Sequence, residues 1–454
     1  MHRLLIFALI GLAPFAAAAA PLSKVQKSAV DETVAEWLAE TGAPSVSIAI
    51  VSGNDIAYAR AYGNARLHPR VPATTETRYE IGSISKQFTA AAVLLLQERG
   101  KLSLDDKVAK YFPTFAGADR VSIRQLLGHT AGYRDCSPQD FPTPRESRPI
   151  SEAAFLKEWA TKPLDFVPGT QWQYSNTDFH IAAAIVEKVS GEPLFTFLQK
   201  NIFRPLRMTG VLNGDAAPAM DVEGYTRYGK GPVRVAPRSG AGWRLGAGGL
   251  VMTPSDLARW YISLMNRSLL SARSYDALYT PQKLADGSDT NYSLGLEAWR
   301  NHGRLGLGHD GGSSGSRADS RAWPAEKLAI IAFANNDWVM AESVDDRLAN
   351  VVLPPTPMEG KARALFDGFQ KGTVDRSLLS ENANAYLTPA VLGDQKAGLA
   401  PLGPVRTFIL QDERERGGMV ARTWRIVTTK ARLDAVERTW PNGKVEQFIV
   451  TKAE

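Results

Sequence analysis

Residues 83–99 read SISKQFTAAAVLLLQER, a strongly helical run with a serine at its start and a lysine one turn later. Residues i and i+3 lie on the same face of a helix, so Ser83 and Lys86 are predicted to meet. A serine hydroxyl is a weak nucleophile at neutral pH and needs an adjacent base or a tuned cation. The positive end of the helix favours an oxyanion at this serine. Ser83 is therefore the candidate nucleophile and Lys86 its activator.

Two downstream motifs carry compatible chemistry. In Tyr174-Ser175-Asn176, the phenol can act as a general base if a lysine stabilises its anion, and the amide can hydrogen-bond a substrate carbonyl or the lysine. Residues 306–312 read GLGHDGG, with the Gly-x-Gly-x-x-Gly spacing of a dinucleotide loop, but no convincing helix follows them. We therefore expect a strand edge where small residues let a substrate approach the backbone and where His309 lines the site.

In this order and at these separations, the three motifs resemble those of the serine β-lactamase-like, penicillin-binding superfamily. Within it they are most similar to the branch of class C β-lactamases, D-Ala-D-Ala carboxypeptidases, D-aminopeptidases and esterases. The resemblance covers roughly residues 25–350. It rests on several motifs in a fixed order, which makes it more specific than any one motif alone. Supporting segments lie at residues 126–132, 174–177, 205–208 and 247–258.

The resemblance implies a role for each motif residue in a two-step acyl transfer. Ser83 would be acylated, Lys86 would help to move the serine proton, and Tyr174 would be the general base. Asn176 would position the substrate carbonyl. The backbone N–H groups of Ser83 and Gly312 would form the oxyanion hole. The implied reaction proceeds through an acyl-enzyme without a metal or organic cofactor.

The third motif departs from the β-lactamase pattern, because His309-Asp310-Gly311 stands where Lys-Thr-Gly is usual. With Gly312, His309 and Gly311 are expected to bind substrate. A lysine offers a substrate carboxylate a permanent charge, whereas a histidine is only partly charged near neutrality, and Asp310 adds a negative charge. We therefore expect a peptidase or esterase. The alternatives are a class C-type β-lactamase and a non-catalytic cell-wall peptide-binding or penicillin-binding protein on the same scaffold.

The hydrophobic patterning predicts an α/β (α+β) fold of the β-lactamase/transpeptidase-like type. An antiparallel sheet is flanked by terminal helices and carries a mostly helical insertion over about residues 101–240. The expected helices cover residues 23–40, 83–99, 178–189 and 341–351. The expected strands lie at residues 46–50, 56–62, 295–299, 317–323 and 328–334, and the first two form a hairpin with a turn at residues 52–55.

Residues 1–20 are predicted to be a secretory signal peptide, with Arg3 before an apolar run and alanines at its end. No later segment is long and apolar enough to span a membrane. The mature protein is therefore expected in the periplasm or outside the cell. Its one cysteine, Cys136, allows no internal disulfide.

The charge pattern limits the partners that we expect. The formal net charge is +6, with basic and acidic residues interspersed and no basic run, so the sequence predicts no nucleic-acid partner. The histidines show no metal-ligand spacing, so no metal site is predicted. The expected partner is a small-molecule or peptide substrate, and the oligomeric state stays open.

The chain is expected to divide into two domains. Residues 21–353 form the hydrolase domain, and residues 354–357 form a linker, since three prolines occur in the five residues 353–357. Residues 358–454 form a small α+β domain that is helical in character over 360–384 and strand-like over 405–451. This domain resembles, more weakly, those of the nuclear-transport-factor and ketosteroid-isomerase type. It contains no catalytic motif, so we expect an accessory role.

Overall fold

The computed structural model describes residues 21–139, 142–216, 221–301, 304–354 and 356–452. The signal-peptide prediction for residues 1–20 lies outside them. The chain forms two compact units, one ending at Asp345 and one beginning at Asp346. This division falls inside helix α9 (Glu342–Val352), before the expected boundary at residue 353. Among the described residues, no helix is long and apolar enough to cross a membrane.

The first unit contains the predicted antiparallel sheet, in the order β3-β2-β1-β12-β11-β10-β9. The two central strands are buried at every residue, which is typical of strands covered on both faces. They pair in a register that places Ile48 opposite Ala332. The strands are β1 (Ser45–Ser52), β2 (Asp55–Leu67), β3 (Arg70–Pro72), β9 (Glu297–Asn301), β10 (Arg304–Ser313), β11 (Ser316–Trp323) and β12 (Leu328–Ala334).

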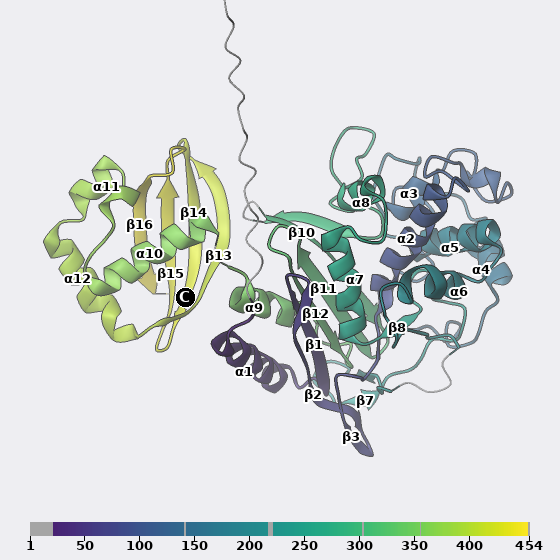
Figure 1. The fold of residues 1–454 in the computed structure, drawn as a ribbon, viewed down its shortest axis with the longest axis horizontal. Coiled ribbons are helices and arrows are strands. Elements are labelled where there is room, and N and C mark those ends of the chain that lie inside the picture. The colour runs from purple at the N-terminus through teal and green to yellow at the C-terminus, as the bar shows by residue number, and fades with distance from the viewer. Residues whose placement is uncertain (1–20, 140–141, 217–220, 302–303, 355, 453–454) are drawn as a thin grey trace, which may run out of the picture. The chain divides into compact units, whose positions relative to one another are not determined.

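Helices cover both faces of this sheet (Figure 1). On one face lies α1 (Lys24–Thr41), whose fully buried Trp37 donates from its indole N–H to the Ser343 hydroxyl over 2.6 Å. On the other face, α7 (Pro254–Asn266) packs against β1, β2 and β12. The terminal helices expected at residues 23–40 and 341–351 are present as α1 and α9, whereas α7 was not expected from the sequence.

Helix α2 (Ser85–Glu98) forms the centre of the hydrolase unit, and every residue from Ser85 to Leu96 is buried. A helix that is buried on all sides belongs to the core of a large domain. It packs against α5 (Asn176–Ser190) and α6 (Leu194–Leu198). A short 3₁₀ turn, η1 (Gly82–Ile84), precedes α2. Ser83 therefore lies just before the α-helix rather than within it.

In the middle of the chain, over about residues 101–240, the regular elements are mainly helices, as predicted, and long loops connect them. The remaining elements of this unit are η2 (Val108–Lys110), α3 (Ile123–Leu127), α4 (Glu152–Trp159), the π-helix η3 (Gln199–Phe203), α8 (Ala272–Tyr279), and the short strands β4 (Tyr79–Glu80), β5 (Leu212–Asn213), β6 (Tyr225–Thr226), β7 (Arg234–Val235) and β8 (Leu250–Met252).

The second unit has its own helices, sheet and core. Its helical part is not one continuous helix over residues 360–384, because Gly372 ends the first helix in the left-handed conformation at φ 77°. Pro357, the last residue of the expected linker, is the first residue of that helix. The four strands form an antiparallel sheet in sequence order. The elements are α10 (Pro357–Lys371), η4 (Arg376–Leu378), α11 (Glu381–Tyr386), α12 (Pro389–Leu399), η5 (Ala400–Leu402), β13 (Val405–Arg416), β14 (Met419–Thr428), β15 (Arg432–Thr439) and β16 (Val445–Lys452).

Phe88 provides a test of how strongly α2 holds the first unit together. Its ring is fully buried, with its centroid 5.4 Å from that of Phe203 and 5.0 Å from that of Trp260. Phe88→Ala should lower the free energy of unfolding by about 3 to 5 kcal/mol, because it removes a buried ring and leaves a cavity. Urea unfolding followed by fluorescence measures this. Val25→Ala, at a 79% exposed side chain, is the control. A loss below about 1 kcal/mol at Phe88 would contradict this packing role.

Candidate active site

The structure brings Ser83 and Lys86 together as predicted, and it buries the lysine completely. The Lys86 Nζ atom lies 3.0 Å from Ser83 Oγ, 2.9 Å from Asn176 Oδ1 and 2.8 Å from the carbonyl oxygen of Ala247. Burial lowers the pKa of Lys86 to about 7, and the negative charge of Asp135 opposes this effect. The neutral amine is therefore accessible near neutral pH, which it is not for a lysine in water.

The partners of Lys86 also fix the direction of its lone pair. The neutral amine keeps two N–H groups, which Asn176 Oδ1 and the Ala247 carbonyl can accept, since neither of these atoms can donate. The lone pair then faces the Ser83 hydroxyl, which can both donate and accept. The arrangement can therefore take a proton from the serine without moving a side chain.

Tyr174 lies beside the same amine, with Lys86 Nζ 4.7 Å from its ring centroid. Burial raises the pKa of Tyr174 well above its usual value, although a hydrogen bond with Ser83 opposes the rise. The phenol is therefore protonated at neutral pH. The ring packs on buried His129, whose Nδ1 accepts a hydrogen bond from the backbone N–H of Ser175 at 3.2 Å. His129 thus supports the wall of the site from behind.

Asn176 is the first residue of α5, and a carboxylate holds its side chain. Asp135 Oδ1 accepts hydrogen bonds from the Asn176 backbone N–H at 2.9 Å and from its side-chain Nδ2 at 3.1 Å. The amide oxygen is thereby turned toward Lys86. Asn176 is expected from the sequence to contact substrate, and in this structure its side-chain amide is engaged by Asp135 and Lys86.

The main chains of η1 and β10 approach each other at glycines. A Cβ atom at Gly311 would lie 1.9 Å from the Ile81 carbonyl oxygen and 3.3 Å from the Ser83 nitrogen. At Gly82, where φ is +50°, a Cβ atom would lie 2.7 Å from the Gly312 nitrogen. The N–H groups of Ser83 and Gly312 are therefore on neighbouring segments at the cleft, the arrangement that an oxyanion hole requires.

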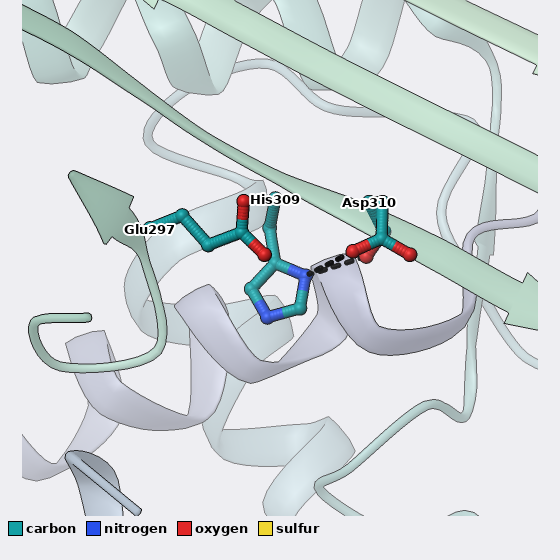
Figure 2. A group of neighbouring side chains, drawn as sticks. All are labelled: Glu297, His309 and Asp310. Carbon is teal, nitrogen blue, oxygen red and sulfur yellow. Dashed lines mark hydrogen bonds and ion pairs between the residues drawn. The ribbon is translucent and has the colours of Figure 1, made fainter. Parts of the chain in front are cut away.

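His309 does not lie on the cleft wall as the sequence suggests, because its side chain is 1% exposed. Its Nδ1–H donates to the Asp310 backbone carbonyl at 2.5 Å, so its Nε2 accepts from the Tyr292 hydroxyl at 2.9 Å. Burial lowers the pKa of His309 to about 4, so the ring is neutral at pH 7. The charged side chain of this motif that reaches the cleft is Asp310, shown with His309 in Figure 2.

These groups surround a cleft of about 420 Å³, a size typical of small-molecule sites. Its charged lining is mainly acidic. Among its lining residues are Ser83, Tyr174, Asn176 and Gly312, the carboxylates Asp135, Glu146, Glu297 and Asp310, and the guanidinium groups Arg244 and Arg317. The Arg244 charge is balanced by Glu80, whose Oε2 lies 2.5 Å from Arg244 Nη1. A cavity of about 330 Å³ shares Ser239, Arg244 and Ser314 with the cleft.

The sequence did not identify Asp135, the Ala247 carbonyl or Glu297 as parts of the site. Asp135 lies shortly after the supporting segment at residues 126–132, and Ala247 begins the supporting segment at residues 247–258. The sequence therefore indicated that both regions belong to the family pattern, but it did not indicate a role for either residue. Glu297 lies at the start of β9, where nothing in the local pattern marks it.

Within the described ranges, one group of side chains has potential metal-ligand atoms that all lie within 4.8 Å of one another. It consists of Glu297, His309 and Asp310. Both ring nitrogens of His309 are already engaged, by Asp310 and by Tyr292. A metal ion bound through this histidine would have to displace one of those hydrogen bonds.

Two solved structures share the fold of this chain. A D-amino acid amidase from Ochrobactrum anthropi SV3 matches with a TM-score of 0.64 and 20% identity, covering 72% of this chain and 98% of the amidase. An octameric penicillin-binding protein homologue from Pyrococcus abyssi matches with a TM-score of 0.61 and 21% identity, covering 95% of this chain and 99% of the homologue. At these identities the likeness establishes the fold.

Sequence comparison gives the family. The model of the Beta-lactamase family matches residues 30–352. Penicillin-binding protein 4* of Bacillus subtilis (strain 168) is 26% identical over 410 residues, covering 83% of this chain and 90% of the relative. A D-aminopeptidase of Brucella anthropi is 29% identical over 410 residues, covering 88% of this chain and 76% of that protein. The protein is a hydrolase of the β-lactamase fold. It belongs to the Beta-lactamase family.

The contact between η1 and β10 can be tested with two glycines. Gly311→Ala should reduce the rate at which a fluorophosphonate labels the protein by at least about 100-fold, because a backbone carbonyl blocks the new Cβ and β10 must move away from Ser83. Gly312→Ala should cost less, since its Cβ would meet the terminal guanidinium of the Arg317 side chain rather than backbone atoms. Gly360→Ala, where no atom lies within 4 Å of the new Cβ, is the control. Equal losses at residues 311 and 312 would contradict this assignment.

Proposed function

We propose that the protein hydrolyses amide or ester bonds of small D-amino-acid derivatives and peptides through an acyl-enzyme formed on Ser83. The observation that carries this proposal is the buried Lys86 amine, with a pKa of about 7, held 3.0 Å from the Ser83 hydroxyl. A general base whose pKa is near the working pH is largely unprotonated, and it still binds a proton strongly enough to take one from the nucleophile.

In the proposed acylation, Ser83 Oγ attacks the substrate carbonyl carbon while its proton passes to Lys86 Nζ. The carbonyl oxygen becomes an oxyanion and accepts hydrogen bonds from the N–H groups of Ser83 and Gly312. The tetrahedral intermediate then collapses, and the bond to the leaving amine or alcohol breaks. The leaving group takes a proton from the Tyr174 hydroxyl, and Lys86 returns its proton to Tyr174.

This assignment changes the role of Tyr174 relative to the expectation from the sequence. With its pKa raised far above 10, the phenol is a proton donor and relay at neutral pH, and the initial base is Lys86. In deacylation, water attacks the acyl carbonyl and gives its proton to Lys86. The bond between the acyl carbon and Ser83 Oγ then breaks, Lys86 returns its proton to Ser83 Oγ, and the carboxylic acid product is released.

The relatives and the cleft charge both support D-amino-acid derivatives as the substrate class. Proteins similar to this chain carry the names D-aminopeptidase and D-amino acid amidase. In this chain His309-Asp310-Gly311 stands where a β-lactamase has Lys-Thr-Gly. Here Asp310 lines the cleft, and His309 is neutral where the lysine would be charged. A β-lactam carboxylate would face these negative charges without a nearby motif cation, so β-lactamase activity is the weaker alternative.

Export to the periplasm or the exterior is part of the proposal. It rests on the signal-peptide pattern of residues 1–20 and on the reliance of the protein on its core rather than on disulfides. Penicillin-binding proteins among its relatives are consistent with a cell-wall environment.

Ser83→Ala should abolish both fluorophosphonate labelling and turnover. The wild-type mature protein should hydrolyse a D-amino-acid p-nitroanilide or a short acyl ester faster than nitrocefin in parallel assays. Intact-mass spectrometry should show one label on the wild type and none on the variant. Unchanged turnover by Ser83→Ala would contradict the acyl-enzyme. Labelling without turnover of any substrate would indicate a binding protein.

Asp135→Asn tests Lys86 as the base. The negative charge of Asp135 raises the pKa of Lys86, so its removal lowers that pKa below about 7. Because the neutral amine accepts the proton, the rising limb of the pH–labelling profile should move to lower pH. Asparagine can still accept hydrogen bonds from Asn176. Asp286→Asn, at a carboxylate outside the cleft lining, should leave the profile in place. An unmoved or upward-shifted limb for Asp135→Asn would argue against this base.

A further inference from the structure

We infer that Glu146 is a positioning residue that fixes one wall of the active-site cleft and thereby sets how tightly the substrate is held beyond its scissile bond. This role rests on the proposed function, because it concerns the substrate of the same cleft. It belongs to a carboxylate that takes no part in the acyl transfer itself.

Glu146 is a buried carboxylate in an exposed stretch of chain. It is 5% exposed, whereas the two residues on either side of it are all exposed. Burying a carboxylate is costly unless hydrogen-bond donors surround it. Here the Ser137 hydroxyl donates over 2.8 Å, Gln139 Nε2 over 2.9 Å and the Thr143 backbone N–H over 2.7 Å. Both carboxylate oxygens therefore accept hydrogen bonds, and these bonds fix the position of the side chain.

These donors belong to a loop that lines the cleft. Among the lining residues are Ser137, Pro138, Gln139 and Pro142. Within the part of the chain that the structure describes, the backbone of residues 136–139 makes no hydrogen bond to another backbone group. A loop without such bonds depends on side chains for its position. Glu146 is the side chain that joins three residues of this loop.

The main chain of Glu146 binds a second loop of the same cleft. Its carbonyl oxygen accepts a hydrogen bond from the Gly240 N–H over 2.7 Å. The two backbones fit closely here, because a Cβ atom at Gly240 would lie 2.3 Å from the carbonyl carbon of Arg148. Ser239 and Trp243 of this second loop also line the cleft. The two loops meet at Glu146, so the shape of the cleft on this side depends on that residue.

The catalytic amine is held by other contacts. Lys86 Nζ has three hydrogen-bond partners within the described chain, and none of them is Glu146 or one of its three donors. Asp135, which supports this centre, is held by two N–H groups of Asn176. Loss of the Glu146 carboxylate should therefore weaken substrate binding more than it slows the chemical step.

Glu146→Gln tests this role, because it keeps the size of the side chain but replaces one acceptor oxygen with an N–H₂ group that faces donors. The KM for D-alanyl-D-alaninamide, which extends on both sides of the scissile bond, should rise by about tenfold or more. The kcat value should change by less than about threefold. The rate of inactivation by methanesulfonyl fluoride, a small probe of the nucleophile, should change equally little.

Glu437→Gln is the matched control. The Glu437 carboxylate is 2% exposed and also has three donors, but it lies in the core of the second unit. This variant should lower the melting temperature and leave KM unchanged. An equal rise in KM for both variants would mean that Glu146 has only a structural role, and it would overturn the inference.

Ser137→Ala keeps the inference testable if Glu146→Gln does not fold. It removes one of the three donors to the carboxylate, so KM should rise in the same direction by about threefold. Ser147→Ala, which should leave KM unchanged, is its control. The Ser147 hydroxyl does not line the cleft, and its partner, the Thr143 carbonyl, keeps the hydrogen bond from the Ser147 backbone N–H.

Binding without turnover separates this role from the acyl transfer. In the Ser83→Ala background, Glu146→Gln should weaken the binding of D-alanyl-D-alaninamide about tenfold, as measured by calorimetry. Unchanged binding and unchanged KM would overturn the inference. A fall in kcat and in the inactivation rate at an unchanged KM would also overturn it, because Glu146 would then support the catalytic groups instead. In either case, covalent modification of Ser83 in the wild type shows that the acyl transfer stands.

Discussion

One buried amine organises the hydrolase unit. Lys86 has no exposed surface, and an amine removed from water must have polar partners nearby. Its three partners come from the turn before α2, the start of α5 and the segment at Ala247, which are far apart in the sequence. The same burial lowers the lysine pKa to about 7. The contact that joins these segments therefore also produces the base beside Ser83.

The sequence predicts the parts of this site that depend on local geometry. Ser83 and Lys86 meet because three residues make almost one helical turn, and the alternation of apolar residues locates the strands around them. Asp135 and Glu297 were not predicted, because a loop path and a cross-strand register bring them to the cleft, and one sequence encodes neither visibly. The expectation for His309 failed by one position, since strand alternation turns it inward and Asp310 outward.

In the second unit, too, the sequence predicts the features that depend on local patterning. The strand-like pattern over residues 405–451 follows from local patterning, with Pro441-Asn442-Gly443-Lys444 as a hairpin turn, and the structure contains four strands there. The break at Gly372 depends on a left-handed residue, which a glycine permits but does not require. Inside this unit, Glu437 is 2% exposed and accepts from the Trp424 indole N–H at 2.7 Å, so its core includes a satisfied polar group.

The wall formed by β10 has a consequence for how this protein can evolve. Position 311 allows no side chain, because the Ile81 carbonyl fills that space, and position 309 is occupied by a ring that packs against the core. Position 310 faces solvent, and its side chain makes no contact that the backbone arrangement requires. A single codon change there can alter the charge that incoming molecules meet while the serine, the amine and the phenol stay in place. Selection can therefore change substrate preference through residue 310 without moving the catalytic side chains, although the charge of Asp310 also raises the pKa of Lys86 and of Tyr174.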